Sequence, residues 1–267
     1  ERIRALGSDL VQPILTPRFA PACTDALLAG IGELAVATAT TIQTHCSESD
    51  WEHAYALERF GVSDTMALDR FGLLRDGTVL AHCGHAGGAD LAVMRERGAG
   101  VAHCPLSNAY FGDAVFGARR AISAGVHVGL GSDLAGGYHL GLLPQASHAV
   151  TSSRMLETGT DHERASDARG RAESAIDTVT AFWMATAGGA ASIGHPTGIL
   201  EPGRPFDAVA IDLEQSTHDV RSGLNWWPEI DDDRRTFEKI VNTAGAVDVA
   251  GVWVAGRRVS RGAQRDR

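Results

Sequence analysis

The stretch TTIQTHCSESDWEHAYALERFG, residues 40–61, shows the pattern that decides the fold. A β-branched, apolar run ends in polar residues, and a loop and an amphipathic helical stretch follow it. Similar apolar runs occupy residues 11–19, 78–83, 99–105 and 126–137, and helical stretches lie between them at 22–39, 87–98 and 116–125. Strands that alternate with helices in this way predict βαβ units and a parallel sheet.

Polar residues gather at the carboxyl end of each predicted strand. In a TIM-like (β/α)8 barrel this is the face that carries the chemistry, so several strands each contribute a residue to one site. A doubly wound open sheet is the competing fold, but no GxGxxG sequence follows a first strand. We therefore expect an α/β protein built on a TIM-like barrel of the metal-dependent hydrolase type.

The pattern changes after about residue 150. Helices are predicted at 152–159 and 174–194, and strands with tight turns at 198–213 and 249–260. We assign residues 1–195 to the barrel and residues 196–267 to a small flanking β-sandwich element with a tail.

The composition excludes several classes of partner. Acidic residues outnumber basic ones by 33 to 24 and the net charge is −9, with no Lys/Arg cluster, which argues against nucleic acid. No apolar stretch reaches the roughly 18 residues that a membrane span requires. Four cysteines in 267 residues do not form a disulfide framework, so we expect reduced thiols in a cytoplasmic protein.

A homodimer is one option for its assembly. The aromatic and acidic stretch 226–239 is interpreted as a subunit contact, a cover for the site or an ordered surface loop.

Three His-Cys pairs stand at predicted strand ends, at residues 45–46, 82–83 and 103–104. Successive side chains on a strand point to opposite faces, so one pair cannot place both residues in a barrel interior. We expect each histidine to point inward and each cysteine to pack outward as a small apolar residue. The sequence has no C-x-x-C, which excludes the structural zinc motifs and the cytidine-type deaminases. A cysteine nucleophile remains a minor alternative.

His45, His82 and Asp133 each end a different predicted strand. Two imidazole nitrogens and a carboxylate aimed at one point suit Zn²⁺ or Fe²⁺, whereas Ca²⁺ and Mg²⁺ prefer shells made of oxygen alone. Taken singly, each residue has an ordinary explanation, as a hydrogen-bonded core histidine or an aspartate that caps a turn. Glu48, three residues after His45, adds a group that can shuttle protons for a water molecule activated by a metal. Together the four residues favour a catalytic metal centre.

Three further histidines are assigned other roles. His103 also ends a strand, but the CPLSN turn that follows gives it a structural explanation, as an anchor for the loop; metal ligation by His103 is the lesser alternative. His53 and His85 lie in helix or loop positions, and we expect them at the surface or behind the site.

Several motifs carry a resemblance to a known family, namely THCSE, AHC, AHCPLSN and GLGSDLAGG in that order. They resemble the amidohydrolase superfamily, and the further pieces TPRF and DLAGGY make the chain similar to its guanine deaminase group. The resemblance covers roughly residues 11–213. It implies a (β/α)8 barrel with a flanking β-sandwich and one zinc ion, used to hydrolyse guanine to xanthine and ammonia.

The resemblance also implies roles for single residues. His45 and Asp133 would be zinc ligands. His82 would contact the attacking water or the substrate without necessarily binding the metal. Glu48 would take a proton from the water and deliver it to the purine ring, while Asp133 helps to hold the attacking hydroxide.

Two residues are implied to bind the purine substrate alongside His82. Arg18 would read the purine carbonyl, because its fork of donors rejects a base that offers an amine at that position. Phe19 would lie against the ring. Without the resemblance, a surface salt bridge explains Arg18 and a core position explains Phe19 equally well.

One motif of the family, a His-x-His pair, is missing from this sequence. The family carries a His-x-His pair on its first barrel strand, which supplies two further zinc ligands, and this sequence has no H-x-H. We expect the chain to begin before the fourth strand and to hold strands 4 to 8, either as a fragment or as a chain completed by another. Zinc affinity should then fall. The rival functions are another aminohydrolase or triazine chlorohydrolase, which Arg18 and Phe19 disfavour, and a noncatalytic half-barrel binding module, which the intact catalytic set disfavours.

Overall fold

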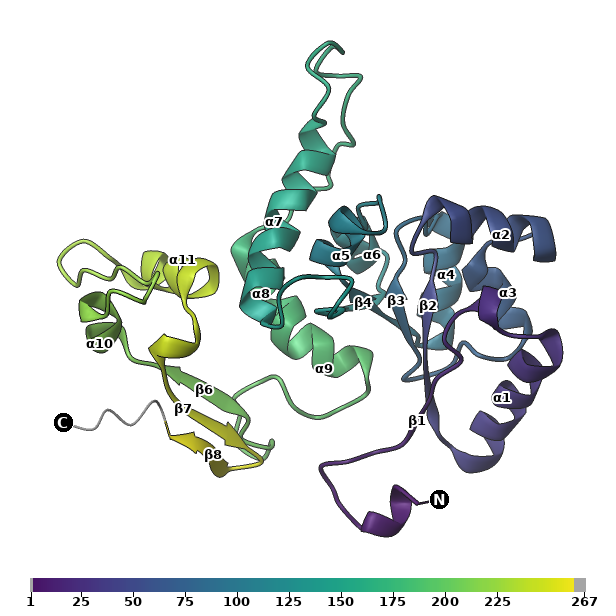
Figure 1. Ribbon diagram of the computed structural model, residues 1–267, viewed down its shortest axis with the longest axis horizontal. Helices are drawn as coiled ribbons and strands as arrows, with labels where there is room; N and C mark the ends of the chain where they lie inside the picture. The colour runs from purple at the N-terminus through teal and green to yellow at the C-terminus, as the bar shows by residue number, and fades with distance from the viewer. Residues whose placement is uncertain (1, 262–267) are drawn as a thin grey trace.

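The computed structural model describes residues 2–261 of the chain (Figure 1). Five strands form one parallel sheet, in which each strand pairs with the next along the chain. They are β1 (Ile14–Leu15), β2 (Thr41–Cys46), β3 (Val79–His82), β4 (Gly100–His103) and β5 (His127–Leu130). The predicted parallel α/β sheet is confirmed.

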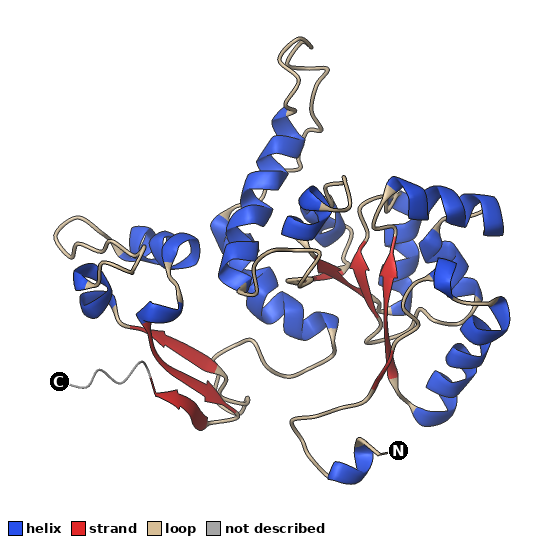
Figure 2. Cartoon of the chain, viewed as in Figure 1, coloured by secondary structure: helices blue, strands red, loops and turns tan. Residues whose placement is uncertain are grey.

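Helices lie on both sides of this sheet (Figure 2). The first group comprises α1 (Asp25–Thr38), α2 (Asp50–Phe60), α3 (Asp64–Arg70), α4 (Gly88–Arg97) and α6 (Ala118–Ser123). The strand residues that share the core with these helices are fully buried and apolar: Ile42, Leu80, Val101 and Val128. Burial of this continuous apolar layer drives the packing of sheet and helices.

Local sequence fixes the ends of these helices. Thr24, Ser49 and Ser63 precede α1, α2 and α3, and each side chain accepts a hydrogen bond from a backbone N–H of the first helical turn. Gly61 and Gly98 follow α2 and α4 with left-handed backbone, which glycine adopts at no steric cost.

A second helical layer packs on the other face of the sheet. It contains α7 (Leu142–Thr158), α8 (Thr178–Trp183), the π-helical segment η3 (Met184–Gly188) and α9 (Gly189–Ser192). Gly129 permits the close approach, because a Cβ there would lie 2.7 Å from the Cα of Gly189. The strand register places Gly129 on the same face as His45. At β2 the face that carries His45 is less covered by helices, and Gln43 on that face is exposed.

A three-stranded sheet follows, in which β6 (Ala208–Ile211), β7 (Val249–Val254) and β8 (Arg257–Arg261) pair antiparallel. The helices α10 (Leu213–His218) and α11 (Asp233–Thr243) lie between β6 and β7 in the chain. The ring of Phe237 on α11 meets that of Phe182 on α8 edge to face at 5.2 Å. The stretch 226–239 thus forms a loop and the start of α11, and α11 lies beside α7 and α8 (Figure 1).

Several short elements complete the chain: α5 (Pro105–Tyr110) and the 3-10 turns η1 (Arg4–Leu6), η2 (Ala20–Ala22) and η4 (Ala246–Asp248). The CPLSN stretch, predicted as a turn, is the start of α5, because Pro105 favours the first position of a helix. The strand predicted at 11–19 shrinks to two residues, since Pro13 and Pro17 bracket it and neither can donate a backbone hydrogen bond.

Other expectations stay predictions. In the described residues β1 and β5 are the two edges of the sheet, so closure into an eight-stranded barrel, the flanking sandwich and the division at residue 195 are not tested. The four cysteines are free and buried. No helix within residues 2–261 has the length and apolar character needed to cross a membrane.

Candidate metal centre and active site

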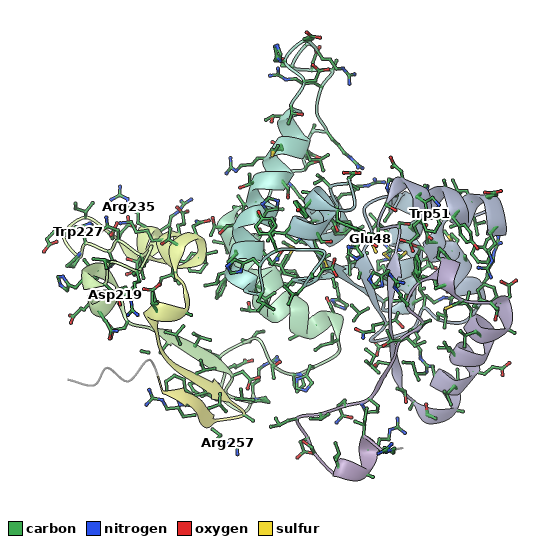
Figure 3. All side chains as sticks on the ribbon, in the orientation of Figure 1. Glu48, Trp51, Asp219, Trp227, Arg235 and Arg257 are labelled. Atoms are coloured by element: carbon green, nitrogen blue, oxygen red, sulfur yellow. The ribbon has the colours of Figure 1, made fainter. Side chains whose placement is uncertain are left out.

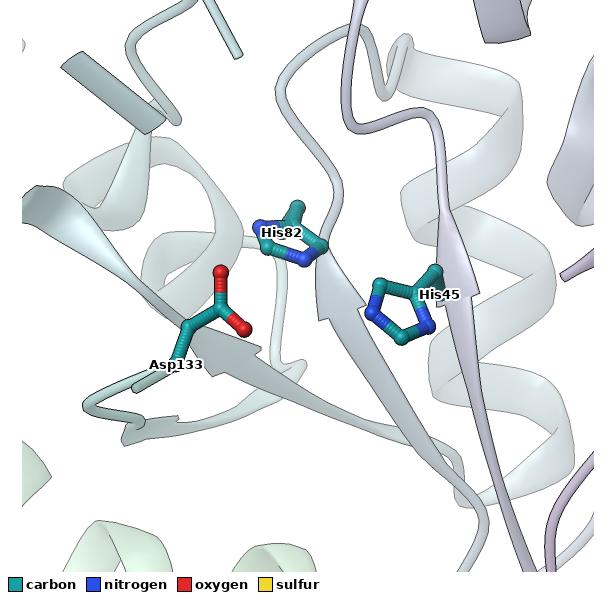
Figure 4. Close-up of side chains that lie close together, drawn as sticks. All are labelled: His45, His82 and Asp133. Atoms are coloured by element: carbon teal, nitrogen blue, oxygen red, sulfur yellow. The ribbon is translucent and has the colours of Figure 1, made fainter. Parts of the chain in front are cut away.

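His45, His82 and Asp133 converge at the carboxyl ends of the strands (Figure 4). His45 lies near the end of β2, His82 ends β3, and Asp133 follows β5. One ligand atom from each lies within 4.8 Å of the others, and the two imidazole rings stack at 5.2 Å. The three residues singled out in the sequence therefore come together, a spacing that a single small cation can bridge.

His45 is oriented by the backbone of the neighbouring segment. The carbonyl oxygen of Arg18 accepts hydrogen bonds from the backbone N–H of His45 at 3.0 Å and from its Nδ1 at 2.7 Å. Because Nδ1 donates, the ring carries its proton there, and Nε2 keeps a lone pair for a metal.

His82 reaches the site by a different route from the one predicted. The register pairs it with Cys46, whose side chain is buried on the face that packs against α3. Strand alternation alone would send the His82 side chain to the same face. His82 and Cys83 instead have φ of 72° and 55°, which turn the chain at the strand end. The ring Nδ1 donates to Oδ1 of Asn108 at 2.9 Å, leaving Nε2 as a buried atom without a hydrogen-bond partner in the described chain.

Asp133 is held by α5 and by the glycines that follow it. The hydroxyl of Ser107 donates to Oδ2 of Asp133 at 2.5 Å. A Cβ at Gly136 would lie 2.5 Å from the same oxygen, so only glycine leaves room for the carboxylate. Ser107 and Asn108, both within CPLSN, were not recognised in the sequence as site residues; the motif was visible, but their partners lie 26 residues away.

Glu48 lies beside the ligand cluster formed by His45, His82 and Asp133. It follows β2 in the loop before α2, and Trp51 lies at the start of that helix; both residues are labelled in Figure 3. One carboxylate oxygen is 3.7 Å from Nε2 of His82, and the side chain is 18% exposed. The carboxylate therefore has access both to the cluster and to solvent, as a proton shuttle requires.

Arg18 and Phe19 border the site. The guanidinium carbon of Arg18 lies 4.9 Å from the centre of the Phe19 ring, which in turn lies 6.4 Å from the rings of His45 and Trp51. The Arg18 side chain is exposed, and its contact with His45 is made by the backbone carbonyl. Substrate binding by the side chains of Arg18 and Phe19 stays a prediction.

The other histidines stay outside the ligand cluster. His103 is buried with its ring 5.3 Å from that of Phe116, and burial, with repulsion from His82 as a smaller cause, lowers its pKa to about 3. His53 and His85 stack on each other at 5.1 Å, and both are partly exposed.

Two of the four thiols, those of Cys46 and Cys104, are poor candidates for a nucleophile. A hydrogen bond with Cys83, together with burial, raises the pKa of Cys46 well above its ordinary value. Burial raises the pKa of Cys104 to about 12. A thiol must ionise to attack, so these shifts argue against Cys46 and Cys104 as nucleophiles.

The donor set fits a transition metal. It offers two imidazoles whose free nitrogens are set by hydrogen bonds on the opposite ring nitrogen, and one carboxylate. Among the described residues the buried Nε2 of His82 has no hydrogen-bond partner, which is unfavourable unless a cation or a polar ligand meets it. Nitrogen and oxygen donors of this kind suit Zn²⁺ or Fe²⁺.

Comparison with known proteins identifies the family. The sequence profile of the Amidohydrolase family matches residues 1–259. The chain therefore belongs to this family, and the resemblance noted in its motifs is confirmed.

The similar proteins include several guanine deaminases. The probable guanine deaminase of Schizosaccharomyces pombe is 35% identical over 258 residues, an alignment that covers 94% of this chain and 46% of the relative. The guanine deaminase of Dictyostelium discoideum is 29% identical over 267 residues, covering 97% of this chain and 55% of that protein. The chain thus spans about half the length of the curated relatives it matches.

A solved guanine deaminase structure has a similar fold. The guanine deaminase from C. acetobutylicum with bound guanine in its active site superposes with a TM-score of 0.81 at 26% identity, covering 95% of this chain and 56% of the other. An adenosine deaminase from Xanthomonas campestris with bound zinc gives 0.76 at 22% identity over 96% and 53% of the two chains, a likeness of fold alone.

Proposed function

We propose that this chain provides the catalytic, zinc-binding part of an enzyme that hydrolyses guanine to xanthine and ammonia. The observation that carries the proposal is the convergence of His45, His82 and Asp133, with the Glu48 carboxylate 3.7 Å from His82. The similarity to guanine deaminases, one of them solved with guanine bound, supports guanine as the substrate.

In this proposal His45 and Asp133 hold the metal, with Zn²⁺ favoured over Fe²⁺. His82 lies close enough to both to be a third donor, although its role in the family resemblance is toward water or substrate. Such an ion supplies a nucleophile near neutral pH by lowering the pKa of water. The hydrogen bonds that the two rings donate from Nδ1, to the Arg18 carbonyl and to Oδ1 of Asn108, fix the tautomers in which Nε2 is free.

Glu48, His82 and Asp133 move the protons and hold the attacking group. Glu48 takes a proton from the attacking water and delivers it to the purine ring. The remaining hydroxyl proton of the adduct passes to the exocyclic amine, which leaves as ammonia. His82 and Asp133 hold the attacking oxygen against the carbon that bears this amine. The bond from Ser107 keeps the Asp133 carboxylate in one orientation while it does so.

Arg18, Phe19 and His82 bind the substrate. Phe19 offers a ring face at the border of the cluster, and the exposed guanidinium of Arg18 can turn toward a carbonyl oxygen. A guanidinium offers only donors, so a purine with an amine at that position leaves them unpaired.

A complete site calls for more than this chain contains. The family resemblance implies two further ligands from a His-x-His strand, and the matched relatives are about twice as long as the part that this chain covers. We propose that these ligands come from additional sequence or from another chain. A homodimer and a cytoplasmic location belong to the same proposal.

The test combines metal binding with turnover. Zinc bound per chain is measured by equilibrium dialysis, and loss of guanine is followed by its ultraviolet absorbance, both on this chain alone and on the chain supplied with the His-x-His segment of a relative. We expect turnover at least in the supplemented protein, and a loss of about 10²–10⁴-fold in Glu48→Gln, the range of general acid–base catalysis. Zinc stoichiometry should be equal in wild type and Glu48→Gln.

The outcomes separate the rival functions. Stoichiometric zinc with turnover of a triazine or another purine but not guanine would replace the substrate. Neither zinc nor turnover in the supplemented protein would refute the enzyme and favour a noncatalytic binding module.

A further inference from the structure

The turn that carries Glu48 is conformationally demanding. Ser47, directly before Glu48, has φ of 50° and is 2% exposed. A residue with a Cβ is disfavoured in this left-handed region, so the surroundings must hold it there.

Two buried carboxylates hold the backbone of this turn. The hydroxyl of Ser47 donates to Oδ2 of Asp64 at 2.6 Å, and the backbone N–H of Glu48 donates to Oε2 of Glu52 at 2.8 Å. Asp64 and Glu52 are only 1% and 2% exposed. Buried acids carry a large desolvation cost, which a helix cap on the surface avoids.

A glycine also packs closely against this turn. A Cβ at Gly112 would lie 2.6 Å from the carbonyl oxygen of Glu48, too close for any residue but glycine. The Ser47–Glu48 turn is thus fixed both by hydrogen bonds and by close packing against Gly112.

Resting on the proposed role of Glu48, we infer that Glu52 and Asp64 are positioning residues that fix the Ser47–Glu48 backbone and so place the Glu48 carboxylate beside Nε2 of His82. Neither acid belongs to the ligand cluster of His45, His82 and Asp133 within the described residues. Each acts through a bond to the turn, and a displacement of about 1 Å in a catalytic group can cost about 10²-fold in rate.

The electrostatics agree with a positioning role. Burial raises the pKa of Glu52 to about 7, although the bond from the Glu48 N–H opposes that rise. Burial also raises the pKa of Asp64, although its bond from Ser47 opposes the rise. The bond from the Glu48 N–H to Glu52 is separate from the cap of α2, which Ser49 supplies.

Glu52→Ala and Glu52→Gln form the central test, with Glu58→Ala as control, since Glu58 is exposed on the same helix. Glutamine keeps an oxygen acceptor for the Glu48 N–H, and alanine does not. We expect faster amide hydrogen exchange at Glu48 in Glu52→Ala only. In the active form we expect kcat to fall about 10²-fold in Glu52→Ala, with restoration by glutamine. The KM for guanine and the zinc stoichiometry should stay unchanged.

Equal exchange at Glu48 in wild type, Glu52→Ala and Glu58→Ala would overturn the inference, and so would a fall in kcat that glutamine fails to restore. If Glu52→Ala does not fold, the pair Asp64→Ala and Asp64→Asn replaces it, with exchange at Ser47 and Glu48 as the readout.

The exchange readout also keeps the inference apart from the proposed function. A wild type that never turns over guanine would refute the proposed function, while the exchange pattern would still decide whether the two acids fix the turn. An active wild type with a fully active, folded Glu52→Ala would overturn the inference alone.

Discussion

Replacing Glu52 with glutamine should make the stability of the fold less sensitive to pH between about 4.5 and 7. Burial raises the pKa of Glu52 from 4.5 to about 7 in the folded state. Within this window the folded chain binds more protons than the unfolded chain, so stability falls as pH rises. Above pH 7 the carboxylate is charged in both states and the full penalty applies. Glutamine cannot ionise and therefore carries no such penalty.

The size of the effect follows from the shift. A pKa rise from 4.5 to about 7 corresponds to about 3 kcal/mol of lost stability above pH 7, at about 1.4 kcal/mol per unit. Glu52→Gln should accordingly gain up to about 3 kcal/mol over wild type at pH 8, relative to the difference between the two at pH 4.5.

Urea unfolding at pH 4.5, 6 and 8 measures this difference. Glu58→Gln, at an exposed position of the same helix, is the control and should show no comparable pH-dependent gain. The comparison is valid where the variants share one dependence of the free energy of unfolding on urea. A constant difference between Glu52→Gln and wild type across the three pH values would refute the argument that burial makes this group hard to charge.

Four further results are expected. His45→Ala should abolish stoichiometric zinc binding in equilibrium dialysis without loss of the fold by circular dichroism, because His45 is half-buried and outside the core. Gly129→Ala should destabilise the chain by about 1–3 kcal/mol in urea unfolding, because the new Cβ meets the α9 backbone at 2.7 Å. His103→Leu should flatten the fall in stability between about pH 6.5 and 3 in acid titration; the folded pKa of about 3 means that the unfolded chain binds the extra proton there. Arg18→Ala should raise the KM for guanine more than it lowers kcat in steady-state assays, because its backbone bond to His45 survives.

The sequence predicted the strands and helices that frame the site because both have clear periodicities. The strand at His45 runs as predicted, with Cys46 buried against Thr65 of α3 and His45 on the opposite face. The same rule fails at His82, where the register alone would turn the ring toward the helices. Positive φ at His82 and Cys83 reverses this, and neither residue is a glycine that would have signalled it.

Contacts that cross between segments could not be predicted from spacing. CPLSN was recognised as a motif, yet the bonds from His82 to Asn108 and from Ser107 to Asp133 depend on how α5 packs against the ends of β3 and β5. The roles of Glu52 and Asp64 were missed for a related reason. Acidic residues at the start of a helix are common as favourable partners of its dipole, and only burial distinguishes these two.

Each proposed catalytic group in this chain is oriented by other residues of the same chain. The pairs are His45 with the Arg18 carbonyl, His82 with Asn108, Asp133 with Ser107, and Glu48 with Glu52. A site whose donors are already held in place loses little further freedom when a cation binds. The chain alone should therefore bind zinc weakly but at the same residues as the supplemented enzyme. Cobalt absorption spectra that lose intensity with His45→Ala in both forms would agree with this reasoning, and cobalt bound elsewhere in the isolated chain would contradict it.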